Sequence, residues 1–125
     1  MTQPIRVLIA DDSSRARAGL RTLLATEPDI VVVGEASNGR EAVHLAAERR
    51  PAVVLMDLQM PLLDGAQATR LIKDRWPSVV VVVVTMHADE EAVAIAAGAD
   101  AFVVKGDAPE RVLAALRTGH VAGKP

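Results

Sequence analysis

The sequence contains no cysteine among its 125 residues. This excludes a disulfide scaffold, a thiolate zinc site and a cysteine nucleophile. Proteins of a reducing compartment manage without disulfides, so we expect a cytoplasmic location. Tyrosine is also missing, and the chain has one tryptophan and one phenylalanine. Valine, leucine, isoleucine and alanine must therefore fill the core.

The chain lacks an apolar stretch of membrane-spanning length. Residues 1–4 also lack the charged and apolar regions with which a signal peptide begins. The net charge is -2, which gives no basic surface for nucleic acid. We therefore expect no contact with a membrane, and no DNA-reading element within this chain.

Half of the residues are hydrophobic, which suffices for one domain with a substantial core. Apolar runs bounded by turn residues predict five strands, at residues 5–10, 30–33, 52–56, 79–84 and 101–104. The run at 79–84 consists of six valines without alternation, which is typical of a strand covered on both faces.

Apolar residues at helical spacing follow each of these strands. The expected helix starts are Asp12 or Ser13, Asn38 with Glu41, and Asp64 with Gln67, and the last two helices cover residues 90–97 and 108–118. Strand and helix alternate five times, which predicts an α/β fold: a doubly wound, five-stranded parallel sheet with helices on both faces. Residues 119–125 contain two glycines and a proline, so we expect a tail or the start of a linker after a domain of residues 1–118.

Polar side chains follow four of the five predicted strands. They are Asp11 and Asp12, then Asp57, Thr85 and Lys105. Each alone has an ordinary explanation, such as a helix cap for Asp12 or a solvated surface charge for Lys105. Together they would share one rim, because parallel strands end at the same edge of a sheet, where ligands bind in such folds.

The chemistry of this rim follows from its charges. Three clustered carboxylates repel one another unless a cation intervenes, and an all-oxygen donor set favours Mg²⁺. A metal, a hydroxyl and an ammonium are components of phosphoryl transfer, and an aspartate can act as the acceptor. Asp57 is best placed for that role, since it stands alone at a central strand end among apolar neighbours.

These residues resemble the receiver domain of two-component response regulators along essentially the whole chain. The matching positions are Asp11-Asp12, Met56-Asp57, Met60-Pro61, Asp64-Gly65, Thr85, Ala97-Gly98-Ala99-Asp100 and Lys105. The resemblance implies a flavodoxin-like sheet of strand order 2-1-3-4-5. It also implies a regulatory switch rather than a turnover enzyme, with self-catalysed phosphoryl uptake and release only.

By this resemblance, Asp57 is the phosphoacceptor, and a sensor histidine kinase supplies the phosphoryl group. The implied Mg²⁺ ligands are Asp12, Asp57 and the backbone carbonyl of Gln59, with Asp11 acting through water. Gln59 and His87 lie two residues past Asp57 and Thr85, so we expect both to flank the path of the water that removes the phosphoryl group.

The resemblance also assigns the switch. Thr85 and Lys105 would contact the phosphoryl group, and Phe102 would be the aromatic residue that moves with Thr85. The run Thr85-Met86-His87-Ala88 and the Gly106-Asp107 pair are similar to the subfamily with a C-terminal LuxR-type helix-turn-helix domain. We therefore expect control of transcription through a DNA-binding domain outside this chain, and the resemblance allows for a homodimer on phosphorylation.

The sequence departs from the family at two places. Gly106 follows Lys105 where many members have proline, so we do not expect the cis peptide that often accompanies that proline. The segment 85–105 is short by about half a helical turn, within residues 89–97. This leaves open whether the usual signalling surface forms.

Three other functions are compatible with an α/β domain of this kind. A metal-dependent phosphohydrolase usually has a carboxylate two residues after its nucleophile, where this chain has Gln59. A nucleotide-binding α/β domain fits poorly, because no glycine-rich loop follows the first strand. A phosphate-independent interaction module with a degenerate switch remains the alternative, on account of the short fourth helix.

Overall fold

The structure is a computed structural model that describes residues 3–122. Its elements are β1 (Ile5–Ala10), α1 (Ser14–Ala25), β2 (Ile30–Ala36), α2 (Gly39–Arg49), β3 (Val53–Met56), α3 (Gly65–Arg75), β4 (Val80–Thr85), the 3₁₀ turn η1 (Ala88–Glu90), α4 (Glu91–Ala96), β5 (Ala101–Val104) and α5 (Pro109–Ala122). No helix among the described residues is long and apolar enough to span a membrane.

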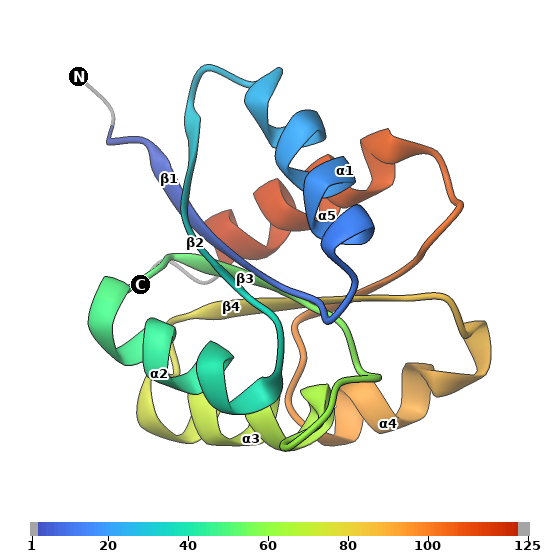
Figure 1. Cartoon of the computed structure of the whole chain (residues 1–125). Coiled ribbons are helices and arrows are strands. Elements are labelled where there is room, and N and C mark those ends of the chain that lie inside the picture. Colours follow the sequence, from blue (N-terminus) through green and yellow to red (C-terminus); the bar gives the residue numbers. More distant parts are fainter. Residues whose placement is uncertain (1–2, 123–125) are drawn as a thin grey trace.

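The five strands form one parallel sheet in the order β2-β1-β3-β4-β5. Helices α1 and α5 cover one face, and α2, α3 and α4 cover the other (Figure 1). The predicted fold class and strand order are therefore confirmed. The carboxyl ends of β1, β3, β4 and β5 meet at one edge, which is the edge on which the expected site lies.

Two hydrophobic clusters, one on each face of the sheet, hold the helices in place. Successive residues of β4 belong alternately to the two clusters. Val81 and Val83 pack under α3 and α4. Val82 and Val84 pack under α5. All six residues of β4 are buried, as the valine run predicted. A strand covered on both faces has little freedom to shift, so its last residue is held in a fixed place.

Local capping signals set three helix starts. The Ser13 side chain, not that of Asp12, accepts the Ala16 N–H and caps α1. Asn38 caps α2 through the Glu41 N–H. At α3 the predicted pair of Asp64 and Gln67 forms a complete capping box.

Two elements extend three or more residues beyond their predicted ends. Strand β2 continues past Val33 to Ala36 through a shift in register, with Val7 opposite Val32 and Leu8 opposite Gly34. Helix α5 continues to Ala122 instead of ending at Thr118, so the expected tail begins as helix, and residues 123–125 lie outside the described part. Gly119 does not end the helix: a Cβ there would lie 2.7 Å from Val80 Cγ1, so glycine allows α5 to approach β4 closely.

The fourth helix is short, in line with the short segment noted in the sequence. After the turn η1, α4 has six residues, and one of them, Ala94, is buried. Val93 and Ile95 on the same helix are 53% and 61% exposed. This segment is therefore held to the sheet by little apolar contact.

Candidate functional site

Backbone hydrogen bonds carry the parallel pairing one residue beyond the strands and fix the start of each loop. Asp11 N–H donates to the Ala36 carbonyl at 3.0 Å, and Asp57 N–H donates to the Ala10 carbonyl at 2.9 Å. Lys105 N–H donates to the Thr85 carbonyl at 2.6 Å. The polar side chains that follow the strands are therefore set at one rim.

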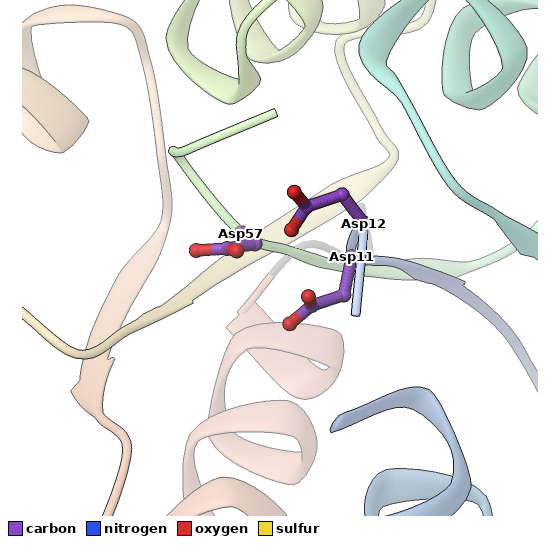
Figure 2. Close-up of side chains that lie close together, drawn as sticks. All are labelled: Asp11, Asp12 and Asp57. Atoms are coloured by element: carbon purple, nitrogen blue, oxygen red, sulfur yellow. The ribbon is translucent and has the colours of Figure 1, made fainter. Parts of the chain in front are cut away.

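Three carboxylates converge at this rim. One ligand oxygen from each of Asp11, Asp12 and Asp57 can be chosen so that all lie within 4.8 Å of one another (Figure 2). Asp11 and Asp57 are 1% and 6% exposed, whereas Asp12 is exposed to solvent. Because Ser13 caps α1, the carboxylate of Asp12 is not needed at the helix end and remains available to the cluster.

Lys105 reaches across this cluster from the end of β5. Its Nζ lies 2.6 Å from Asp11 Oδ2 and 3.5 Å from Asp57 Oδ2. The other oxygen of Asp11 accepts the Ser13 N–H at 2.9 Å. Asp11 therefore has a partner on both oxygens.

Burial raises the pKa of the Asp57 carboxyl, and the nearby charge of Asp11 raises it further. The positive charge of Lys105 opposes this rise without cancelling it. Burial lowers the pKa of Lys105, but its hydrogen bond to Asp11 and the charge of Asp57 outweigh burial, so that its pKa lies above the usual range. The charged form of Lys105 is therefore favoured. The charged form of Asp57 is disfavoured by burial and by the charge of Asp11.

The donor set fits Mg²⁺. The cluster offers carboxylate oxygens alone, and like charges in partly buried positions are the arrangement that a hard divalent cation relieves. The cluster opens into a cleft of about 230 Å³ lined by Asp11, Asp12, Ser13, Asp57, Gln59, Thr85, Met86, His87 and Lys105. This cleft has room for metal-bound water and for a phosphoryl group.

Thr85 lies at the rim as predicted, but its hydroxyl is already engaged. Thr85 Oγ1 donates to Glu90 Oε1 at 2.9 Å and accepts the His87 N–H at 3.4 Å. The second oxygen of Glu90 accepts from Gln59 Nε2 at 2.6 Å. Glu90 thus bridges two expected site residues.

Sequence reasoning missed Glu90. Glu90 follows Thr85 by five residues and lies at the end of the turn η1, and Gln59 is 31 residues away in the chain. No sequence signal pointed to it, because only the structure reveals that this glutamate at a helix start does not cap that helix.

The remaining predicted residues are placed as follows. His87 is exposed and lines the same cleft as Gln59. Phe102 is half-buried against the cluster under α3 and α4, and it pairs with Val83, two residues before Thr85 on the same face of the sheet. The structure thus brings every predicted site residue except Phe102 to the cleft.

Gly106, which replaces the proline common in the family, has a φ of 96°. That left-handed conformation favours glycine, so the residue is suited to the turn that follows Lys105. All peptide bonds of the described residues are trans, as expected for a chain without proline at this position.

The chain matches the model of the response regulator receiver domain over residues 7–117. Among curated proteins, it is 42% identical over 121 residues to the uncharacterized transcriptional regulatory protein YhcZ of Bacillus subtilis, covering 95% of this chain and 55% of that protein. It is 44% identical over 110 residues to a protein-glutamate methylesterase/protein-glutamine glutaminase of Myxococcus xanthus, covering 86% of this chain and 31% of that protein. The chain therefore spans about half, or less, of these relatives.

Among solved structures, a two-component response regulator of the LuxR family from Aurantimonas superposes with a TM-score of 0.90 at 31% identity. The match covers 96% of this chain and 87% of that one. The family match and the superposition each cover nearly the whole chain. The carboxylate cluster and Lys105 lie within the matched residues. The chain belongs to the response regulator receiver domain family.

Proposed function

We propose that this domain accepts a phosphoryl group on Asp57 in a Mg²⁺-dependent reaction and changes conformation to control an output. One observation carries the proposal. A nearly buried carboxylate lies within 4.8 Å of two others and 3.5 Å from a lysine ammonium, at the carboxyl edge of a parallel sheet. Such an arrangement is costly for stability and suited to phosphoryl transfer.

The reaction is an in-line exchange at phosphorus. An oxygen of Asp57 forms the new bond to phosphorus while the bond between phosphorus and the donor breaks. With a phosphohistidine donor, the phosphorus–nitrogen bond breaks and the leaving imidazole takes a proton from solvent. Lys105 neutralises charge on a phosphoryl oxygen, and Thr85 donates its hydroxyl to another.

Asp12, Asp57 and the Gln59 carbonyl would hold the metal, with Asp11 acting through water. When bound, Mg²⁺ supplies positive charge that offsets the carboxylates and the incoming phosphoryl group. Lys105 holds Asp11 in place from the other side. Without the metal, repulsion from three carboxylates keeps the phosphoryl donor away from Asp57.

A sensor histidine kinase is the proposed donor, and transcription is the proposed output. The transcriptional relative YhcZ and the LuxR-family structure support this output. The relative from Myxococcus xanthus shows that a similar segment also occurs in a protein that is named as an enzyme. We infer that the native chain continues beyond Pro125 into a DNA-binding domain and that phosphorylation favours a homodimer. A stop codon directly after Pro125 in the source gene would contradict the first of these two inferences.

The test is incubation with acetyl phosphate and Mg²⁺, read by intact mass. Wild type is expected to gain one phosphoryl group, with none gained in EDTA. Asp57→Ala is expected to gain none, whereas Asp74→Ala, which removes an exposed aspartate on α3, is expected to behave as wild type. Labelling that persists in Asp57→Ala would place the acceptor elsewhere and overturn the assignment.

A further inference from the structure

The carboxylate of Glu90 lies in an unusual place for a residue at the start of a helix. Glu90 ends η1 and directly precedes α4, yet its side chain makes no capping hydrogen bond to that helix. It turns toward the cleft, where it accepts from Thr85 Oγ1 at 2.9 Å and from Gln59 Nε2 at 2.6 Å. Its hydrogen bonds therefore join the α4 segment to the phosphoryl site.

The Thr85 hydroxyl cannot serve Glu90 and a phosphoryl group at once. A hydroxyl has one proton to donate, and in this structure Glu90 receives it. Thr85 is fully buried, so a solvent molecule does not readily take the place of either partner. A phosphoryl oxygen can gain the Thr85 proton only after the carboxylate of Glu90 has left.

Charge acts in the same direction. In the described part of the chain, the ion pairs of Lys105 reach Asp11 and Asp57, and none reaches Glu90. A phosphoryl group adds about two negative charges near a carboxylate that has no cation of its own. Repulsion then favours departure of Glu90 once Asp57 is phosphorylated.

We propose that Glu90 is a gate: its carboxylate occupies the position of a phosphoryl oxygen on Thr85, slows phosphoryl uptake, and on phosphorylation is expelled and releases η1 and α4. The proposal rests on the proposed function of Asp57 as phosphoacceptor. The released segment is well suited to move, because α4 has six residues and buries one of them. Glu90 is thus a positioning residue that connects the site to the surface around Val93 and Ile95.

The kinetic test compares phosphoryl uptake from acetyl phosphate at saturating Mg²⁺. Glu90→Ala is expected to be labelled roughly fivefold to tenfold faster than wild type, because a hydrogen bond to a charged group no longer has to break. Glu90→Gln, which keeps the shape and loses the charge, is expected to lie between the two. Glu91→Ala is the matched control, since it removes the same charge one residue along the chain from an exposed side chain.

The structural test follows the backbone amides of Val93 and Ile95 by ¹⁵N NMR. In unphosphorylated Glu90→Ala, these signals are expected to shift toward their positions in wild type bound to Mg²⁺ and trifluoroberyllate, a phosphoryl mimic. Glu91→Ala is expected to leave them in place. The NMR spectrum of Glu90→Gln also reports whether removal of the charge alone preserves the fold, so a folding defect in the alanine variant does not decide the outcome.

The failures of the two proposals are distinguishable. No labelling of wild type and of every Glu90 variant would contradict the assignment of Asp57. Normal labelling of wild type, with Glu90→Ala, Glu90→Gln and Glu91→Ala all at the same rate and with unmoved α4 signals, would overturn the gate alone. A slower uptake in Glu90→Gln, in a folded protein, would also overturn it.

Discussion

Lys105 and Asp11 form the shortest ion pair of the site, with Nζ 2.6 Å from Oδ2, although they lie 94 residues apart in the chain. The side chain of Asp11 is 2% exposed and that of Lys105 is 23% exposed. This pair ties the end of β5 to the end of β1. It keeps the buried carboxylate next to Asp57 neutralised before any phosphoryl group arrives.

Loss of Lys105 is therefore expected to destabilise the fold. In Lys105→Met the free energy of unfolding in EDTA should fall by about 2 kcal/mol, because Asp11 remains buried without its cation. Lys105→Met combined with Asp11→Asn should recover most of this loss. Urea unfolding followed by circular dichroism measures both values, and an unchanged midpoint for Lys105→Met would contradict the expectation.

Asp57 itself is expected to lower stability when no metal is bound. Burial and the charge of Asp11 place its folded pKa above the unfolded value, so the folded state holds the proton more tightly. Stability should therefore fall as the pH rises from the ordinary carboxyl range through the raised pKa. Asp57→Asn should be more stable than wild type at pH 7 in EDTA, and the difference should vanish at acid pH, below both pKa values.

Mg²⁺ should reverse the order of stability of wild type and Asp57→Asn. At ten times its Kd, Mg²⁺ is expected to stabilise wild type by about 1.4 kcal/mol, since it binds the folded state alone. Asp57→Asn should gain much less, because it loses one of the three clustered carboxylates. Thermal unfolding with and without MgCl₂ measures this, with CaCl₂ as a comparison cation. Equal stabilisation of both proteins would place the metal away from Asp57.

Gln59 and His87 line the cleft on the solvent side of the site, where a water molecule would approach the phosphoryl group. Gln59→Ala and His87→Ala should change the lifetime of phosphorylated protein by up to about tenfold, which corresponds to 1.4 kcal/mol in the barrier. Neither should prevent labelling. His44→Ala is the control, because His44 is an exposed histidine on α2. Decay rates of purified phosphoprotein, followed by intact mass, provide the test, and unchanged decay in both variants would contradict the prediction.

Much of the fold could be predicted because its signals are local. The valine run at 79–84 and the Asp64 and Gln67 pair each carry their structure in neighbouring residues. The extension of β2 to Ala36 could not be seen, because it depends on hydrogen bonds to β1 and includes the polar Glu35. Gly119 was misleading for a similar reason, since its small size serves the close approach to Val80 rather than a helix end.

The same distinction applies to the site. Asp11, Asp12, Asp57 and Lys105 follow strands of one sheet, so topology alone brings them together. Glu90 does not follow a strand, and its place depends on how η1 folds back over the rim. A hydrogen bond made through a short irregular turn has no periodic signal, which is why the sequence did not point to it.

We expect a second response to phosphorylation at Phe102. Its side chain is half-buried: it packs against the cluster under α3 and α4, and it also lines a surface cleft beside α5. Phenylalanine has no hydroxyl, so an inward and an outward position differ through packing alone. The free energy between them should be small, on the order of 1 kcal/mol, and a modest movement of Thr85 toward a phosphoryl group can shift the balance.

A ¹⁹F label on Phe102 should therefore report two environments whose populations change on phosphorylation. Thr85→Ala should abolish the change, because the hydroxyl that follows the phosphoryl group is gone. Glu90→Ala should instead shift the populations before phosphorylation, since Thr85 is then free of its carboxylate partner. A single signal that stays in place in all three proteins would leave Phe102 as a core residue. Phosphorylation of Asp57 would then be expected to reach the surface through the movement of η1 and α4.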